Sequence, residues 1–184
     1  MRALIVVDAQ NEFSPHGLRA VPNHSSALAA IHRHATEARR NGNPIAWVQH
    51  HNKPTESQAF VPGTWGAALS PGLGPEPGQR TERLFVKNVY GAFTNTGLEE
   101  WLRGLGVTEV LIVGFYTHMC LSTSVREALV RDFEVAVDPD ATGARDINDD
   151  HLGQQSADEV RRSALLQLVN MGATIVTTGV AASV

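Results

Sequence analysis

The sequence contains a single cysteine, Cys120, at a position that suits a reactive thiol. It follows the apolar run VLIVG at 110–114, which predicts a buried strand, and precedes LSTSVREALVRD at 121–132, which predicts a helix. A helix N-terminus carries partial positive charge and unpaired N–H groups, which favour a thiolate and can bind an oxyanion. A lone cysteine cannot form an internal disulfide, so Cys120 serves either packing or chemistry.

An aspartate and a lysine stand at the ends of two other predicted strands. Asp8 comes directly after the apolar run at 2–7, and Lys87 is the last residue of the run at 83–87. Because ligands bind beyond the carboxyl ends of parallel strands, we expect both side chains to lie near Cys120. Asp8 could then accept the thiol proton and return it to a leaving amine, while Lys87 stabilises the thiolate.

Each of these three residues also has a purely structural interpretation. Asp8 could cap the turn after its strand, Lys87 could be an ordinary surface lysine, and Cys120 could be a small buried hydrophobe. For the cysteine considered alone, packing is the better interpretation. The coincidence of a carboxylate, an ammonium and a thiol at three strand ends favours chemistry.

Apolar runs alternate along the whole chain with segments of helical periodicity. Strands are predicted at 2–7, 44–49, 83–87, 109–114, 133–138 and 173–178, and helices at 25–40, 96–103, 120–131 and 157–171. Several of the strands are continuously apolar, as expected when helices cover both faces of a parallel sheet. The sequence therefore predicts a three-layer, Rossmann-like α/β/α fold with a six-stranded, mainly parallel sheet in a single domain spanning 1–184.

Two long polar segments interrupt the alternation, and we expect both to be loops. One is the Pro- and Gly-rich stretch at 51–82, and the other is 138–155. Loops of such length in a compact domain are usually functional or disordered. No GxGxxG or GxxxxGK[ST] motif follows the first strand, so the sequence gives little support to a dinucleotide site or a P-loop.

Composition excludes several classes of partner. The net charge of −4 gives no reason to expect nucleic acid or an anionic membrane. No apolar run approaches the roughly 20 residues that a membrane-spanning helix needs. The N-terminal MRALIVVDAQ lacks the long apolar region and the cleavage site of a signal peptide, and with one cysteine we expect a cytoplasmic protein.

Three segments, in this order, resemble the motifs of the isochorismatase-like hydrolases, the cysteine hydrolase superfamily that includes nicotinamidases and other small-amide hydrolases. LIVVDAQNEF at 4–13 resembles the opening strand with its D-x-Q-N-[DE]-F segment. FVKNVYGAF at 85–93 resembles K-x-x-Y-x-x-F, and VGFYTHMCLSTSVREAL at 113–129 resembles G-x-x-T-x-x-C with its helix. The resemblance covers nearly the whole chain.

The resemblance implies both a catalytic triad and a mechanism. The Asp–Lys–Cys triad of the family corresponds to Asp8, Lys87 and Cys120. The family also implies a cis peptide bond between Phe115 and Tyr116, which turns the Tyr116 N–H toward an oxyanion hole that it shares with the Cys120 N–H. We therefore expect a hydrolase without a cofactor, which cleaves the C–N bond of a small amide through a thioester.

The chain departs from nicotinamidases where those enzymes carry an Asp-x-His pair and a further histidine that bind a metal. Here the matching stretch is Gln49-His50-His51, with no second histidine before Phe60. Glutamine is a poor replacement for a carboxylate ligand, so we expect no metal. True isochorismatases, which hydrolyse a vinyl ether, resemble this chain but have glycine where Cys120 stands. The thiol therefore favours acyl transfer.

Residues that flank the motifs are expected to bind the substrate. They are Gln10, Phe13, His51, Trp65, Tyr90, Phe93 and Tyr116. The aromatic members could line an apolar pocket, although core packing is an equal interpretation of Trp65. His118, two residues before the thiol, could orient its turn or, as the less favoured alternative, transfer a proton. The family implies a homo-oligomer, a dimer or tetramer, in which the loop at 51–82 could reach a neighbouring subunit.

Two other functions stay open at the level of sequence. An isochorismatase-type ether or ester hydrolase would leave the thiol incidental to the reaction. A non-catalytic relative would only bind a small ligand. The complete triad favours hydrolysis of a small-molecule amide over both.

Overall fold

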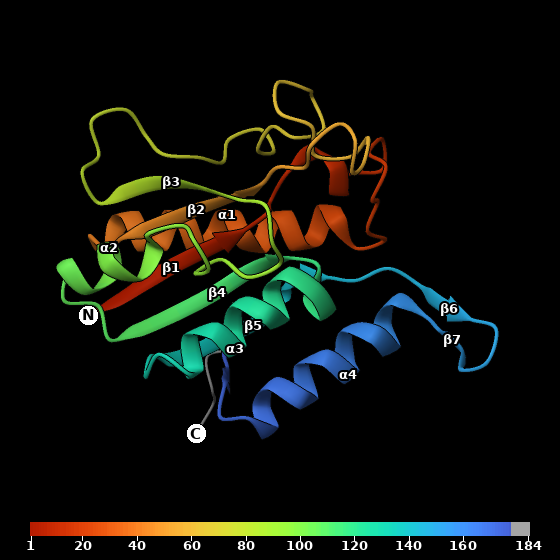
Figure 1. The fold of residues 1–184 in the computed structure, drawn as a ribbon. Helices are drawn as coiled ribbons and strands as arrows, with labels where there is room; N and C mark the ends of the chain where they lie inside the picture. The colour runs from red at the N-terminus through yellow and green to blue at the C-terminus, as the bar shows by residue number, and fades with distance from the viewer. Residues whose placement is uncertain (178–184) are drawn as a thin grey trace.

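A six-stranded parallel sheet forms the centre of the computed structural model, which describes residues 1–177. Its strands are β1 (Arg2–Val7), β2 (Ile45–His50), β3 (Glu82–Lys87), β4 (Glu109–Phe115), β5 (Glu134–Gly143) and β8 (Thr174–Ile175). Their order across the sheet is β3-β2-β1-β4-β5-β8, and every neighbouring pair is parallel. The predicted α/β fold with a six-stranded sheet is confirmed (Figure 1).

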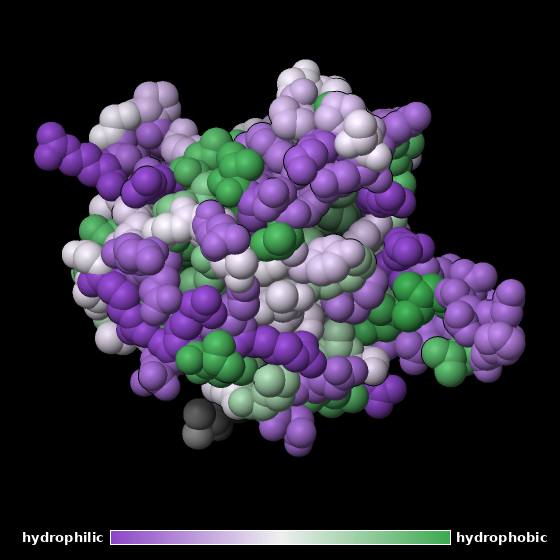
Figure 2. All heavy atoms as spheres, in the orientation of Figure 1, coloured by the Kyte–Doolittle hydropathy of each residue, from purple (hydrophilic) through white to green (hydrophobic). Residues whose placement is uncertain are grey.

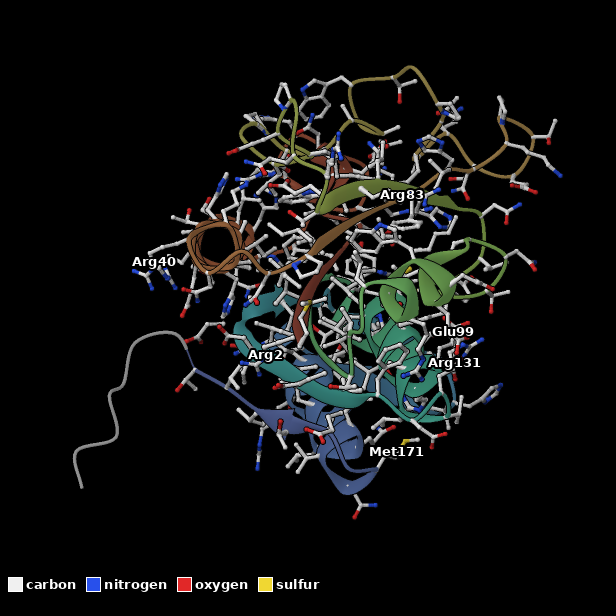
Figure 3. All side chains as sticks on the ribbon, turned by 90° about the vertical axis from the view of Figure 1, so that its left-hand side faces the viewer. Arg2, Arg40, Arg83, Glu99, Arg131 and Met171 are labelled. Atoms are coloured by element: carbon white, nitrogen blue, oxygen red, sulfur yellow. The ribbon has the colours of Figure 1, made fainter. Side chains whose placement is uncertain are left out.

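Helices cover both faces of the sheet. They are α1 (His24–Arg40), α2 (Leu98–Gly104), α3 (Ser122–Leu129) and α4 (Ala157–Asn170). Alternate residues of β1 belong to different cores, since Leu4 packs with α1 and Ile5 packs with the other three helices. The view in Figure 3 accordingly shows α1 on one side of the sheet and α2 and α3 on the other. Three layers result, as predicted.

The helix ends carry polar contacts that fix the outer layers. Glu99 of α2 forms an ion pair of 2.9 Å with Arg131 beyond α3, and Figure 3 shows the two side chains together. Ser156 and Glu159 form a capping box at the start of α4. On the face shown in Figure 2, hydrophobic residues lie in separate patches among polar ones. Within residues 1–177, no helix is both long and apolar enough to span a membrane.

The structure differs from the prediction mainly beyond the fifth strand. β5 continues to Gly143 rather than ending at 138, and the segment expected to be a loop contains a two-stranded hairpin. Its antiparallel strands are β6 (Ile147–Asp149) and β7 (Gly153–Gln155). The short strands consist of mostly exposed, polar residues, so no hydrophobic alternation predicted them. β8 is shorter than the predicted strand at 173–178, of which Thr178 lies outside the described residues.

The strand order changes direction beside β1, and this places several strand ends together. The chain proceeds from β1 to β2 and β3 on one side, then crosses to β4 on the other. Crevices at such a switch point, outside the carboxyl ends of the strands, are where open α/β sheets bind ligands. At this edge a side chain on Gly114 would place its Cβ 1.9 Å from the Val7 carbonyl oxygen, so glycine allows β1 and β4 to approach.

Candidate active site

Asp8 and Lys87 form a buried ion pair at this edge of the sheet. Asp8 follows β1 and has a φ of 52°, and Lys87 is the last residue of β3. Lys87 Nζ lies 2.7 Å from Asp8 Oδ2, and the two side chains are 0% and 1% exposed. Burial alone would lower the pKa of Lys87, but the negative charges of Asp8 and of a Cys120 thiolate outweigh burial and raise it. The lysine therefore stays protonated beside the carboxylate.

Cys120 lies directly beside this pair. It belongs to a π-helical turn, Thr117–Leu121, between β4 and α3. Its Sγ, a carboxylate oxygen of Asp8 and a ring nitrogen of His50 all lie within 4.8 Å of one another. The structure thus brings together the thiol, the carboxylate and the ammonium that the sequence placed at three strand ends.

The resting thiol is neutral, contrary to what a helix N-terminus alone would favour. Burial and the Asp8 carboxylate raise the pKa of the Cys120 thiol, and the opposing charge of Lys87 does not offset them. The regular helix begins only at Ser122, after the π-helical turn. Cys120 therefore needs a base to remove its proton, and Asp8 is the carboxylate within reach.

His50, the last residue of β2, is a member of the site that the sequence analysis passed over. Lys87 Nζ lies 3.1 Å from His50 Nδ1, and His50 Nε2 lies 2.7 Å from Asn52 Oδ1. An ammonium can only donate, so Nδ1 accepts and Nε2 carries the proton. Burial and the charge of Lys87 lower the pKa of His50, which keeps this neutral tautomer. His50 ends its strand just as Lys87 ends β3, so its position at this edge could be predicted from the sequence in the same way.

A cavity of about 260 Å³ opens onto the thiol. Three of the predicted substrate-binding residues line it: Phe13, Tyr90 and Tyr116. Phe60 from the long loop joins them, with its ring centroid 5.3 Å from that of Phe13. The Phe13 ring in turn meets Tyr116 edge-on at 4.8 Å. The cavity is therefore lined by aromatic rings together with the buried side chains of Asp8 and Cys120.

The other four predicted substrate-binding residues do not line this cavity. Gln10 is fully buried and donates to the carbonyl oxygens of His50 and Ala67, so it anchors backbone. Trp65 is 56% exposed on the long loop. Phe93 packs against Phe133 in the core, with ring centroids 5.8 Å apart. His51 donates its backbone N–H to the carbonyl of Lys87, next to the site but outside the cavity lining.

The turn that carries the thiol is tied to its surroundings. The peptide bond between Phe115 and Tyr116 is cis, and the backbone N–H of Leu121 donates to the Tyr116 carbonyl. Ser124 donates its hydroxyl to the Cys120 carbonyl at 2.6 Å and accepts the Ala92 N–H at 3.0 Å. Ser124 thus connects the turn of the thiol to the loop that follows Lys87.

His118 lies on the same turn without a contact to the reacting groups. Its ring centroid is 5.3 Å from that of Tyr116, and its Nδ1 has no hydrogen-bond partner within residues 1–177. Burial and the charge of Arg145 lower the pKa of His118. The expectation that this side chain orients the turn stays a prediction.

The residues present do not fit the metal site of nicotinamidases. Gln49 donates its amide to the Ala67 carbonyl at 3.2 Å, and His51 joins no cluster of three possible ligands in the described part of the chain. The one cluster found among residues 1–177 is Asp8, His50 and Cys120. The ammonium of Lys87 already contacts the first two, so a positive charge occupies that place.

Comparisons with known proteins agree with this fold. The isochorismatase domain model matches residues 2–180. The uncharacterized isochorismatase family protein YddQ of Bacillus subtilis is 30% identical over 178 residues, which cover 96% of each chain. Nicotinamidase 3 of Arabidopsis thaliana is 33% identical over 150 residues, covering 76% of this chain and 72% of that protein. The crystal structure of an isochorismatase from Pseudomonas putida KT2440 superposes with a TM-score of 0.87 at 29% identity, covering 96% of this chain and 88% of the other.

Proposed function

Because the chain belongs to the isochorismatase family, whose domain model matches residues 2–180, we propose that it is a cysteine hydrolase of small-molecule amides. One observation carries the proposal. A neutral thiol, Cys120, stands beside a buried carboxylate, Asp8, whose charge is paired with Lys87, and the thiol opens onto a cavity of about 260 Å³. This arrangement suits acyl transfer to sulfur.

The first step is attack of Cys120 on the amide carbonyl. The thiol gives its proton to Asp8 as Sγ bonds to the carbonyl carbon, and the carbonyl oxygen becomes an oxyanion. The backbone N–H groups of Tyr116 and Cys120 donate to that oxygen. Fixed donors of this kind stabilise developing charge without reorganisation, and one such donor contributes on the order of 100- to 1,000-fold in rate.

The intermediate then collapses to a thioester. Asp8 returns the proton to the amide nitrogen, the C–N bond breaks, and ammonia or an amine leaves while the acyl group stays on Cys120. A water molecule next gives its proton to Asp8 and attacks the thioester. The C–S bond breaks, the thiolate recovers the proton from Asp8, and a carboxylic acid is released. The net reaction consumes one water for each amide cleaved.

Lys87 and His50 support this proton transfer without transferring a proton themselves. The positive charge of Lys87 stabilises the thiolate as it forms and keeps Asp8 in place. Neutral His50 accepts a hydrogen bond from Lys87 at 3.1 Å and so helps to orient the ammonium group. His50 is therefore a positioning residue in the proposed mechanism.

A screen for amide hydrolysis tests the function. Wild-type protein is incubated with small primary amides, ureido compounds and cyclic amides, with Cys120→Ala as the control, and hydrolysis is followed as released ammonia or, for the cyclic amides, as loss of the substrate. We expect at least one compound to be hydrolysed, with turnover falling by about a thousandfold or more in the variant. Undiminished turnover by Cys120→Ala would show that the thiol is incidental to the reaction. That result would favour the alternative of an ether or ester hydrolase.

The oligomeric state and the cellular location of the protein stay predictions. A homo-oligomer, dimer or tetramer, is expected, and light scattering of the purified protein measures its mass in solution. Cytoplasmic localisation is the expectation from the sequence, and fractionation of cells that produce the protein tests it.

A further inference from the structure

Two arginines line the active-site cavity, and neither belongs to the proposed catalytic machinery. Arg19 follows the short 3-10 turn at Asn11–Phe13, and Arg145 comes two residues after the end of β5. Both residues are exposed at the mouth of the cavity, although they lie far apart in the sequence. Neither residue type nor spacing marked them in the sequence.

The backbone of Arg19 is hydrogen-bonded to Tyr116, and Arg145 comes two residues after a strand that is paired with the segment before Tyr116. The Tyr116 hydroxyl donates to the Arg19 carbonyl at 2.7 Å, and the Arg19 N–H donates to the Glu12 carbonyl at 3.0 Å. Arg145 follows Gly143, which is paired in register with Phe115 of β4. Each arginine side chain therefore extends from backbone that lies beside the cavity.

The charges of the two arginines are not compensated. Neither guanidinium forms an ion pair with a carboxylate among residues 1–177, whereas Arg39, for instance, pairs with Glu82 at 2.8 Å. The only carboxylate that lines the cavity is Asp8, and it already pairs with Lys87. Two positive charges thus face a cavity that has no free negative group.

The titration of Tyr116 agrees with this placement. Burial raises the pKa of Tyr116, the charges of Arg145 and Arg19 oppose that rise, and smaller contributions from Cys120 and Glu12 add to it. Both guanidinium groups therefore act on a side chain that lines the cavity beside Cys120. An anion in the same space would meet the same two charges.

We propose that Arg19 and Arg145 bind a carboxylate of the substrate, so that the enzyme acts on small acidic amides. Half-amides of dicarboxylic acids and ureido acids have this chemistry. A guanidinium matches a carboxylate with two parallel hydrogen bonds, which an exposed lysine cannot reproduce. A volume of about 260 Å³ lies just below the usual range for ligand pockets, so only a few atoms can separate the amide from the carboxylate. That the substrate is an amide rests on the proposed function, whereas the binding site for its carboxylate does not.

Alkylation of Cys120 tests the anion site without any substrate. Iodoacetate and iodoacetamide differ by a carboxylate, and a chain with one cysteine gives an unambiguous mass change. The rate ratio of iodoacetate to iodoacetamide is measured at low ionic strength in native protein and in protein unfolded with urea. We expect the native ratio to exceed the unfolded one by about tenfold, and to fall at least threefold in Arg19→Gln and in Arg145→Gln.

Arg80→Gln is the matched control for these variants. Arg80 is exposed just before β3, at the end of the strand remote from Lys87, and does not line the cavity. Its substitution should leave the ratio unchanged. A native ratio no higher than the unfolded one, or an equal effect of all three substitutions, would overturn the proposal.

Turnover separates this inference from the proposed function. The values of kcat/KM are compared for 4-amino-4-oxobutanoate and for succinamide, its uncharged counterpart. A preference of tenfold or more for the acid, reduced in both cavity variants, supports the inference. Equal hydrolysis of both compounds, unaffected by either variant, overturns the anion site and leaves the amidase intact. A preference for iodoacetate without hydrolysis of any amide would give the opposite result. It would support the anion site and contradict the proposed amidase function.

Discussion

The ammonium group of Lys87 lies 2.7 Å from the Oδ2 atom of Asp8, and both side chains are shut off from solvent. No hydrogen bond of standard geometry reaches either carboxylate oxygen from the rest of residues 1–177. Lys87 therefore compensates the charge of Asp8, while lone pairs of the carboxylate stay free to accept a proton. The neighbouring thiol, whose pKa is raised by burial and by Asp8, is the group positioned to supply that proton.

Replacing Asp8 by Asn should separate thiol reactivity from turnover. Asparagine tolerates the φ of 52° at this position, so the backbone need not change. Loss of the negative charge lowers the pKa of Cys120 relative to wild type, because Lys87 remains and Asp8 no longer opposes the thiolate. Alkylation by iodoacetamide at pH 7 should become faster, while amide hydrolysis falls by roughly 100- to 10,000-fold without the base. Faster alkylation with normal turnover would remove Asp8 from the mechanism.

Removing Lys87 should reveal the cost of leaving the buried Asp8 carboxylate unpaired. Lys87→Met leaves a buried, unpaired carboxylate, which costs about 3–5 kcal/mol of unfolding free energy. Urea denaturation followed by circular dichroism measures the loss. The double variant Asp8→Asn/Lys87→Met is the control, and it should recover most of the stability while remaining inactive. Equal stability of the single variant and wild type would show that the charges are not coupled.

The contact between Lys87 and His50 predicts that activity depends on a hydrogen-bond acceptor at residue 50. His50→Leu removes that acceptor and should lower kcat by about ten- to a hundredfold, the equivalent of roughly 1–3 kcal/mol for an unsatisfied buried donor. His50→Asn keeps an oxygen near the position of Nδ1 and should retain more activity. Similar losses in both variants would assign His50 to packing alone.

The same residue predicts how activity changes with pH. The pKa of His50 is lowered by burial and by Lys87, so the ring is neutral at pH 7 and gains a proton only below its ordinary value of 6.5. A protonated ring cannot accept from Lys87 and repels it. Activity should therefore decline on the acid side of pH 6.5, and less steeply in the non-titrating His50→Asn. Identical acid limbs in the two proteins would contradict this role.

Gly114 should be essential for the strand spacing that aligns the site. Its φ is 118°, and an added Cβ would meet the Val7 carbonyl oxygen at 1.9 Å, directly before Asp8. Gly114→Ala should lower the unfolding free energy by at least about 2 kcal/mol, as expected for strain combined with a backbone clash. Gly104→Ala in α2, where a Cβ meets nothing within 4 Å, is the control and should be neutral or slightly stabilising.

The layers of the fold could be predicted because strands buried on both faces are continuously apolar. The proximity of Asp8, Lys87 and Cys120 could be predicted for a related reason, since the ends of parallel strands share one edge of the sheet. The hairpin at 147–155 could not, because its polar, exposed strands carry no periodic signal. Only the backbone pairing, such as that of Ile147 with Gln155, defines it.

The walls of the cavity depend on loop paths that residue types do not specify. Phe93 and Trp65 stand near motif or loop residues, as Tyr90 does, yet only Tyr90 lines the cavity. Arg19 reaches the mouth because Tyr116 and Glu12 bind its backbone, and Arg145 does so because β5 extends to Gly143. Contacts of this kind join distant parts of the chain, so the sequence alone did not indicate them.

The central claim is that Cys120 carries the acyl group during hydrolysis, and the mass of the enzyme in turnover tests it most directly. Wild-type protein is mixed with an amide found in the screen, quenched in acid within milliseconds to seconds, and measured intact and after digestion. We expect an increase equal to the mass of the acyl group, located on the peptide with Cys120, removed by hydroxylamine and absent in Cys120→Ala. Continued hydrolysis with no adduct at any time, together with full activity of Cys120→Ala, would contradict the account.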